Sequence, residues 1–78
     1  MAKIYITLKL FATLAPYLPE NADHFQITDG TTVQALITDF QLPSDAVKLI
    51  FVNGRKQETT YVLKPGDRLG LFPPVGGG

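Results

Sequence analysis

Apolar side chains occupy every second position near the start of the chain: Ile4, Ile6, Leu8 and Leu10. This period of two indicates a β-strand with one buried face. Residues 24–28 repeat the alternation over a shorter length, with Phe25 and Ile27 on one face, and we expect the two strands to pair in an antiparallel manner. Residues 12–23 lack this period but are too apolar for a solvated loop, so they should pack over one edge of the core.

The period changes after Thr31 and Thr32, where apolar residues are spaced by three or four positions: Val33, Leu36, Ile37 and Phe40. This spacing predicts one amphipathic helix, and a threonine hydroxyl before it offers an N-cap. We expect the helix to end near Gln41, because Pro43 disfavours helical geometry in the residue before it.

The second half of the chain predicts three further strands. Residues 47–52 form an apolar run that enters Asn53-Gly54, a pair suited to a tight turn. After it we expect a short polar edge strand, an apolar plug, a turn and the last strand, over residues 55–60, 61–63, 64–67 and 68–72. The complete expected core is Ile4, Ile6, Leu8, Leu10, Phe25, Ile27, Val33, Leu36, Ile37, Phe40, Leu49, Phe51, Leu69 and Leu71.

Alternation along the strands also predicts which side chains face outward. If Leu69 and Leu71 point inward, Phe72 points outward, and Tyr5 does the same on the first strand. We expect Ile50 to join Tyr5 and Phe72 in an exposed apolar patch beside the point where the last strand ends. Apolar anchors of this kind dominate protein interfaces, so the patch is a candidate partner-binding surface.

Size and composition narrow the classes of function. With 78 residues, the chain is expected to form a single small domain with one modest core. Seven basic and seven acidic residues give a net charge of zero, which argues against electrostatic capture of nucleic acid or of an acidic membrane. The chain has no cysteine, which excludes disulfides, zinc–thiolate sites and thiol nucleophiles, and we expect no metal site. No stretch is typical of a signal peptide or a membrane span, so we expect a cytoplasmic protein.

The last eight residues differ in kind from the rest: Leu71-Phe72-Pro73-Pro74-Val75-Gly76-Gly77-Gly78. Proline has no backbone N–H for a sheet, so Pro73 and Pro74 should direct the chain away from the last strand. The three glycines leave the carboxylate of Gly78 uncrowded, so this end could thread a narrow tunnel. We expect a domain over residues 1–75 and a flexible tail over residues 76–78. Taken alone, a glycine run is also typical of a frayed end.

The order of the expected elements predicts an α+β fold, a mixed sheet of four to five strands with one main helix across one face. This is the β-grasp, or ubiquitin-like, architecture, and we expect its first and last strands to be parallel. Residues 48–57, Lys-Leu-Ile-Phe-Val-Asn-Gly-Arg-Lys-Gln, resemble the corresponding stretch of ubiquitin. Gly66-Asp67-Arg68-Leu69 and the ending Phe72-Pro73-Pro74-Val75-Gly76-Gly77-Gly78 resemble the MoaD/ThiS family of sulfur carriers, with the stronger match to MoaD, the small subunit of molybdopterin synthase.

The resemblance implies a sulfur carrier acting with partner enzymes, not an enzyme. An adenylating partner of the ubiquitin-activating type would use ATP and magnesium to activate the carboxylate of Gly78, and a sulfur donor would convert it to a thiocarboxylate. A large synthase subunit or another acceptor enzyme would then take the sulfur, and the chain itself would bind no cofactor. The residues agree, since His24 is the only histidine and paired carboxylates are missing. Asp67 is expected to accept hydrogen bonds from nearby backbone N–H groups instead.

Three hypotheses from different classes remain open at this point. The first is the sulfur carrier, for molybdopterin, tungsten cofactor, thiamin or another sulfur-containing product. The second is a ubiquitin-like protein modifier, in which Gly78 is joined to a lysine amine of a target. The third is a plain β-grasp interaction module with a frayed end. The first two share the activation step and differ only in the acceptor.

Overall fold

The structure, a computed structural model, describes residues 2–43 and 46–74. Its sheet is built from five strands: β1 (Lys3–Leu10), β2 (Phe25–Thr28), β3 (Leu49–Val52), β4 (Arg55–Lys56) and β5 (Arg68–Phe72). Two short 3-10 helices, η1 (Ala12–Tyr17) and η2 (Ala22–His24), connect β1 to β2, and a single α-helix, α1 (Val33–Asp39), connects β2 to β3. The predicted order of elements is therefore confirmed.

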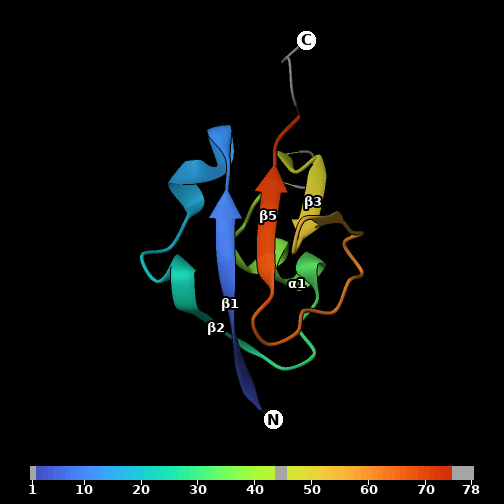
Figure 1. Cartoon of the computed structure of the whole chain (residues 1–78). Helices are drawn as coiled ribbons and strands as arrows, with labels where there is room; N and C mark the ends of the chain where they lie inside the picture. Colours follow the sequence, from blue (N-terminus) through green and yellow to red (C-terminus); the bar gives the residue numbers. More distant parts are fainter. Residues whose placement is uncertain (1, 44–45, 75–78) are drawn as a thin grey trace.

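The strands lie in the order β2-β1-β5-β3-β4. β1 and β5 are the parallel pair, with Leu8 opposite Leu69 and Leu10 opposite Leu71, and both point toward the end where the chain leaves the sheet (Figure 1). The other neighbouring pairs are antiparallel. The β-grasp expectation, including the parallel first and last strands, is thus confirmed.

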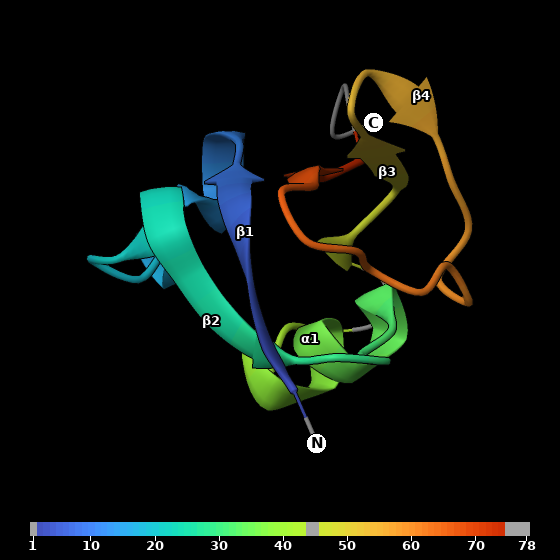
Figure 2. The same ribbon diagram turned by 60° about the horizontal axis from the view of Figure 1, so that its bottom comes forward.

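Helix α1 covers one face of the sheet (Figure 2), which we call the inner face. The Thr32 hydroxyl accepts a hydrogen bond from the backbone N–H of Ala35 at 3.1 Å, so the predicted N-cap is present. Phe40 caps the other end of the helix, and Gln41 follows with a positive φ of 59°. The helix buries Val33, Leu36 and Ile37 against the strands, as its sequence spacing predicted.

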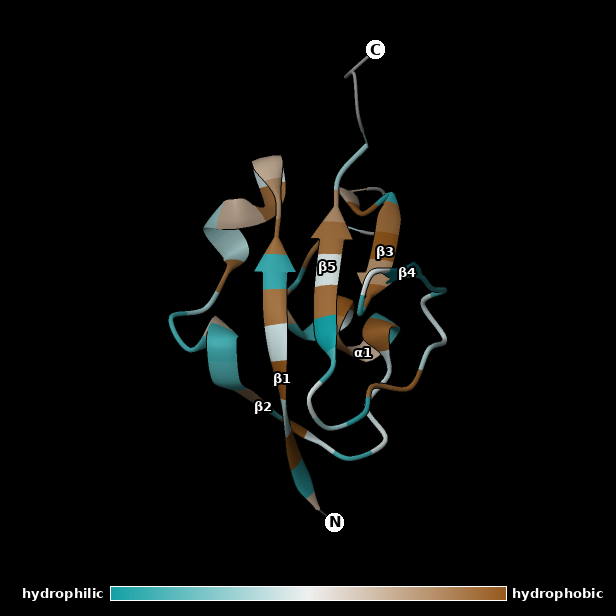
Figure 3. Cartoon of the chain, viewed as in Figure 1, coloured by the Kyte–Doolittle hydropathy of each residue, from teal (hydrophilic) through white to brown (hydrophobic). Residues whose placement is uncertain are grey.

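Aliphatic side chains fill the inner face. Along β1 and β5 they alternate with polar residues or glycine, which appears as bands of contrasting hydropathy in Figure 3. The buried set confirms ten of the predicted core residues: Ile4, Ile6, Leu8, Leu10, Ile27, Val33, Leu36, Ile37, Leu69 and Leu71. Phe25 and Phe40 are half-buried and pack against this core with their rings 5.5 Å apart. Among the described residues, no helix is long and apolar enough to cross a lipid bilayer.

The prediction for β3 was wrong. Leu49 and Phe51 were expected inside, but Ile50 and Val52 are the buried residues of this strand. All four residues of β3 are apolar, so alternation could not decide its orientation. Pairing with β5 decides it, because Ile50 lies opposite Leu71 and Val52 lies opposite Leu69, and both of these point inward.

The loops differ from the sequence expectations in smaller ways. The edge strand expected over residues 55–60 is only Arg55–Lys56, and the plug over residues 61–63 consists mainly of buried Leu63. In the segment between β1 and β2, Leu14 and Ala22 pack into the core as expected, whereas Tyr17 and Leu18 remain exposed.

Candidate functional site

The chain leaves the sheet at the end of β5. The carbonyl of Phe72 accepts a hydrogen bond from the N–H of Lys48 at 2.7 Å, and the carbonyl of Leu71 accepts one from the N–H of Phe11 at 3.2 Å. Pro73 and Pro74 follow without an N–H to extend the strand, so the predicted stop at the prolines is confirmed. Val75, Gly76, Gly77 and Gly78 lie outside the described residues, as does the predicted boundary after residue 75.

Three aromatic rings gather beside this exit on the outer face, the face opposite α1. The ring of Phe72 stacks on that of Phe11, with centroids 4.3 Å apart and 5° between the planes. The ring of Phe51 meets Phe72 edge-on at 5.5 Å. We call Phe11, Phe51 and Phe72 the aromatic cluster. Phe11 directly follows β1, Phe51 lies in β3 and Phe72 ends β5, so the cluster depends on the order of these three strands.

Gly70 makes room for the aromatic cluster. It lies between Lys9 of β1 and Phe51 of β3, and it is buried although it faces outward. A Cβ atom at this position would lie 3.5 Å from ring atoms of both Phe11 and Phe72. The rings therefore lie directly over the backbone of β5, where any large side chain would lift them away.

A shallow, mainly apolar depression of about 230 Å³ accompanies the aromatic cluster. Its wall is formed by the three rings, by Gly54 and Gly70, and by Lys9, Arg68 and Leu69. Phe11 is 40% exposed, so part of this aromatic surface is open to a partner. An apolar surface with a few polar groups, next to the tail, suits docking of another protein better than chemistry within this chain.

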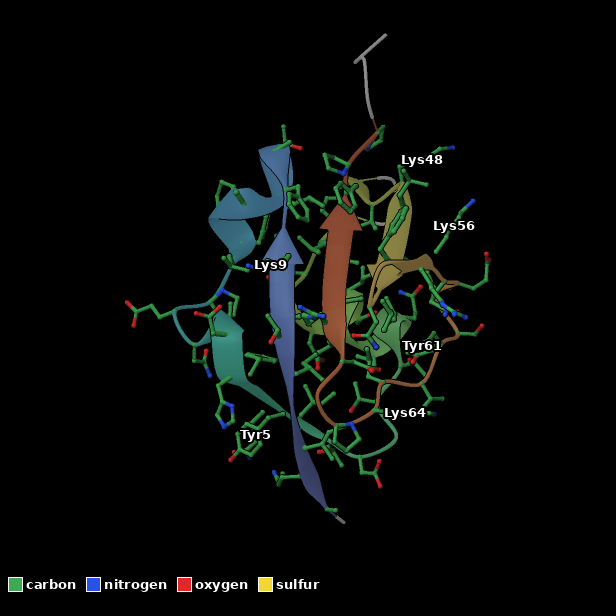
Figure 4. The ribbon with its side chains drawn as sticks, viewed as in Figure 1. Tyr5, Lys9, Lys48, Lys56, Tyr61 and Lys64 are labelled. Carbon is green, nitrogen blue, oxygen red and sulfur yellow. The ribbon has the colours of Figure 1, made fainter. Side chains whose placement is uncertain are left out.

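The predicted partner-binding patch needs two corrections. Ile50 is only 6% exposed, so its predicted exposure was wrong. Tyr5 is exposed as predicted, but it does not lie beside the exit: its carbonyl accepts a hydrogen bond from Gly66, in the turn before β5. From Tyr5 to Phe11 the strand rises about 20 Å, and Figure 4 shows Tyr5 near the opposite end of β1 from Lys9. Of the three predicted residues, Phe72 alone is both outward-facing and at the exit.

Phe11 and Phe51 were not among the predicted partner-binding residues. Phe11 follows the last residue of β1 and continues its outward positions, and Phe51 was assigned to the core. The available signal was Gly70, a glycine inside a strand, because such a position often marks a close approach by another group. An aromatic residue across from a strand glycine is a favourable pairing. This rule would have predicted that Phe51 faces outward.

A second aromatic pair lies at the other end of the outer face. The rings of Tyr5 and His24 stack with centroids 4.0 Å apart, and the Tyr5 hydroxyl donates to Oε1 of Gln26 at 3.1 Å. A depression of about 430 Å³ lies here, with Asp23 and Pro65 in its wall. This end of the sheet holds the larger hollow, but it is remote from the tail.

Asp67 is a structural acceptor, as predicted, and its network is wider than the turn. Its carboxylate accepts a hydrogen bond from the N–H of Lys64 at 2.9 Å, from the Asn53 side chain at 2.9 Å and from the Tyr61 hydroxyl at 3.1 Å. Burial, the hydrogen bond to Asp67 and the charge of that carboxylate together raise the pKa of Tyr61. These contacts fix the start of β5 to the turn between β3 and β4, so they position the strand that carries the tail.

Catalytic and metal-binding groups are sparse in the part of the chain that the structure describes. There, no three His, Asp or Glu side chains lie together as a metal-binding group. Every buried side-chain nitrogen and oxygen in that part has a hydrogen-bond partner. What the structure does show at the exit is the aromatic cluster and the apolar depression beside it.

Comparisons with known proteins agree with this geometry. The family model described as ThiS matches residues 8–78. SAMP1 from Haloferax volcanii is 26% identical with a TM-score of 0.65, over 95% of this chain and 99% of SAMP1. A putative molybdopterin converting factor subunit 1 from Pyrococcus furiosus is 26% identical with a TM-score of 0.67, over 92% of this chain and 99% of that protein.

A complex of subunits 1 and 2 of the molybdopterin-converting factor from Helicobacter pylori contains a chain of the same fold, 23% identical with a TM-score of 0.57, over 96% of this chain and 100% of that chain. A search among curated proteins found no match. The family match covers nearly the whole sequence, from Leu8 near the end of β1 to Gly78. This chain therefore belongs to the ThiS family, within the ThiS/MoaD group of ubiquitin-like sulfur carriers.

Proposed function

We propose that the protein carries sulfur on the carboxylate of Gly78, after a partner enzyme of the ubiquitin-activating type has adenylated it. The observation that carries this proposal is the end of β5: the aromatic cluster lies where Pro73 and Pro74 follow the last strand. The sequence that follows is Val75-Gly76-Gly77-Gly78, so every residue after the valine is a glycine. A partner that binds the aromatic cluster would hold this segment close to its own active site.

The chemistry proceeds in two steps on the partner. The carboxylate of Gly78 attacks the α-phosphate of ATP, pyrophosphate leaves with its magnesium ion, and an acyl-adenylate forms. Hydrosulfide or an equivalent donor then attacks the acyl carbon, AMP leaves, and a thiocarboxylate remains. A closed channel must keep water from the acyl-adenylate, and glycines fit such a channel because they have no side chains. Members of this family are small carrier proteins, and this chain supplies the docking surface and the tail.

The favoured destination of the sulfur is molybdopterin, for the molybdenum or tungsten cofactor. Support comes from the likeness to the putative molybdopterin converting factor subunit 1, at 26% identity over nearly all of both chains. A synthase large subunit is then the second partner. This subunit would bind at the same exit of the sheet, because the thiocarboxylate at the end of the tail must reach its acceptor site.

A second candidate function is protein modification. The equal likeness to SAMP1, a small archaeal modifier protein, favours it. In this case the activated carboxylate of Gly78 is attacked by a lysine amine of a target, and an isopeptide bond replaces the bond to AMP. Both functions need the same adenylation, so they differ in the acceptor and not in the docking surface.

The deciding experiment incubates the chain with an activating enzyme from the same organism, ATP, magnesium and sulfide, and measures intact mass. We expect replacement of one carboxyl oxygen of Gly78 by sulfur. A variant with one alanine added after Gly78 should gain no sulfur and should melt at the same temperature, because the addition lies beyond the sheet. Sulfur gain by the extended variant would place the sulfur elsewhere and overturn the proposal. Isopeptide-linked remnants of the tail on other proteins would instead favour modification.

A further inference from the structure

The two edges of the sheet are protected to different degrees. At one edge, β4 is only two residues long, and both of them, Arg55 and Lys56, are exposed cations. Short length and charge are common means by which a protein keeps an edge strand from pairing with another chain. At the other edge, β2 has the sequence Phe-Gln-Ile-Thr, without charge or proline, and Figure 2 shows it at the margin of the sheet. The free side of β2, which we call the open edge, is therefore the one that an extended chain can join.

The backbone of β2 directs hydrogen-bonding groups toward the open edge. The N–H of Asp29 donates to the carbonyl of Ala2 at 2.8 Å, on the side of β1. Because these directions alternate along an antiparallel strand, Gln26 and Thr28 point their backbone groups away from β1. The carbonyl of Thr28 is already occupied by the N–H and the hydroxyl of Thr31. In the part of the chain that the structure describes, this leaves three groups without a backbone partner: the N–H and carbonyl of Gln26 and the N–H of Thr28.

A depression of about 280 Å³, which we call the β2–α1 groove, lies next to the open edge. Its wall includes the rings of Phe25 and Phe40, which meet edge-on with centroids 5.5 Å apart, and the side chains of Ile27 and Leu36. Side chains alternate between the two faces of a strand, so a strand added to β2 would place every second side chain over this groove. Apolar side chains suit those positions.

The charged side chains around the open edge are mainly acidic. Asp39 is the one charged residue among the described residues of the groove wall. Asp23 comes shortly before β2 and Asp29 directly follows it, and all three aspartates are exposed. Lys3 lies opposite Thr28 on β1, on the side of β2 away from the open edge. Basic side chains at the ends of a bound segment would therefore meet carboxylates.

We propose that the open edge of β2 binds an extended peptide segment of another protein, with apolar side chains over the β2–α1 groove and basic residues at its ends. Such a segment adds one strand to the sheet through the three free backbone groups. The site is separate from the tail, because β2 pairs with residues 3–6 of β1 and β1 lies between β2 and β5. One protein can therefore hold the chain at β2 while the tail beyond Pro73 reacts on another.

A second copy of this chain is the alternative occupant, and charge disfavours it. The free N–H and carbonyl of Gln26 pair with those of Gln26 in another copy in only one antiparallel register. That register brings Asp23 of each copy toward Asp29 of the other. Like charges opposite each other destabilise a pair of strands, whereas a segment with basic ends reverses the sign of this interaction. The charges thus favour a basic peptide over self-pairing.

The probe is a fluorescein-labelled peptide, Lys-Val-Thr-Ile-Thr-Lys, whose valine, isoleucine and last lysine share one face when it is extended. One control peptide has glutamate in place of both lysines. A second has N-methyl groups on its two central amides, which removes a donor in either strand direction. Fluorescence anisotropy measures binding to the full chain. Amide exchange by NMR follows the N–H groups of Gln26 and Thr28, with those of β4 as the internal reference.

Two substitutions at Gln26 test the role of the backbone. Gln26→Pro removes the free N–H, and proline is tolerated on an edge strand where this group faces solvent. Gln26→Ala is the matched control, because it keeps the N–H and both substitutions lose the contact with the Tyr5 hydroxyl. For the charge, Asp39→Lys is compared with Glu58→Lys, which alters the total charge equally at an exposed site after β4. Thermal melting checks the fold of every variant.

We expect the lysine peptide to slow exchange at Gln26 and Thr28 and at no residue of β4. Gln26→Pro should weaken binding at least about tenfold, and Gln26→Ala less than about twofold. Asp39→Lys should weaken it about threefold, with a larger effect at low salt, and Glu58→Lys should leave it unchanged. If Gln26→Pro does not fold, the Asp39→Lys comparison and the amide exchange still decide the matter.

Three results would overturn the inference. The first is no binding of the lysine peptide up to about 1 mM, or equal binding of all three peptides. The second is equal binding by the Gln26→Pro and Gln26→Ala variants. The third is a dimer of the native chain that Gln26→Pro dissociates in analytical ultracentrifugation, which would assign the open edge to a second copy. Sulfur gain at Gly78 is measured separately, so peptide binding without it leaves this inference standing while the proposed function falls.

Discussion

The outer face of the sheet has an aromatic stack at each end, and the two stacks differ in their surroundings. At one end Tyr5 stacks on His24 with centroids 4.0 Å apart, and at the other Phe11 stacks on Phe72 at 4.3 Å. The Tyr5 end has the larger hollow, about 430 Å³ against about 230 Å³. Judged by volume alone, the Tyr5 end would be the candidate functional site. The direction of β5 favours the Phe11 end instead, because the chain leaves the sheet there.

The difference follows from topology. Because β1 and β5 are parallel, the start of β5 lies beside Thr7, and its end lies beside Leu10 and Phe11. The Tyr5 end receives the turn before β5 and is held by hydrogen bonds, including one from Gly66 to Tyr5. At the Phe11 end, the chain leaves the sheet at Pro73. The Phe11 end therefore lies beside the exit, whereas the Tyr5 end lies about 20 Å away along the strand.

The largest expected effect comes from truncating one ring at each end. Phe72→Ala should weaken binding of the activating enzyme by about 30-fold, roughly 2 kcal/mol, as is typical of a central aromatic anchor. Tyr5→Ala, the matched control, should change affinity by less than about twofold. Isothermal titration calorimetry measures both, and thermal melting should show that both variants fold. Equal losses at the two ends would break the comparison and return Tyr5 to the partner-binding surface.

The fold could be predicted from the sequence because local patterns and pairing agree over most of it. Alternation in β1, the helical spacing from Val33 and the Asn53-Gly54 pair each fit only one local structure: a strand with one buried face, an amphipathic helix and a tight turn. Both turn residues have positive φ, 54° and 83°, as their types indicate. The pattern gave the wrong orientation for β3, where both faces are apolar and the orientation depends on the neighbouring strand, and it made the edge strand β4 too long.

The candidate site was predicted in part, for a related reason. Phe72 was placed outward because alternation along β5 is clear, and the prolines marked the exit. Ile50 was misplaced with the rest of β3, and Tyr5 was placed without regard to strand direction. The position of a residue along a strand, relative to the end of a parallel neighbour, depends on register, which single-strand patterns do not contain.

A smaller effect tests the packing under the rings at the exit. Gly70→Ala should keep partner affinity within about twofold and leave stability equal or higher by about 0.5 kcal/mol, because its Cβ fits at ordinary contact distance and alanine loses less entropy than glycine. Gly70→Val adds two methyl groups beneath the rings of Phe11 and Phe72. We expect it to separate the stack and weaken binding by about tenfold, roughly 1.4 kcal/mol. Urea denaturation and calorimetry measure the two quantities.

Strong binding by the Gly70→Val variant would contradict the role of the stacked rings. It would mean that the partner reads only the edge of the surface. Loss of binding in both variants, with normal stability, would instead show that the backbone of Gly70 itself contacts the partner. Either result sharpens which part of the Phe11 end is recognised.

The smallest expected effect belongs to the Tyr5 end, where β5 begins and Asp67 binds Tyr61. The pKa of Tyr61 is raised in the folded protein by burial and by Asp67, so the folded state holds the phenol proton more tightly than the unfolded state. This contribution to stability is complete below the unfolded pKa of about 10, and it is lost as pH rises through the higher folded value. Tyr61→Phe should therefore flatten the decline of the free energy of unfolding above about pH 10, measured by urea denaturation. Adenylation at neutral pH should be unchanged, since the substitution acts on the start of β5 and not on its exit. An unchanged decline in the variant would show that other groups cause it, and slower adenylation would show that the two ends of β5 are coupled.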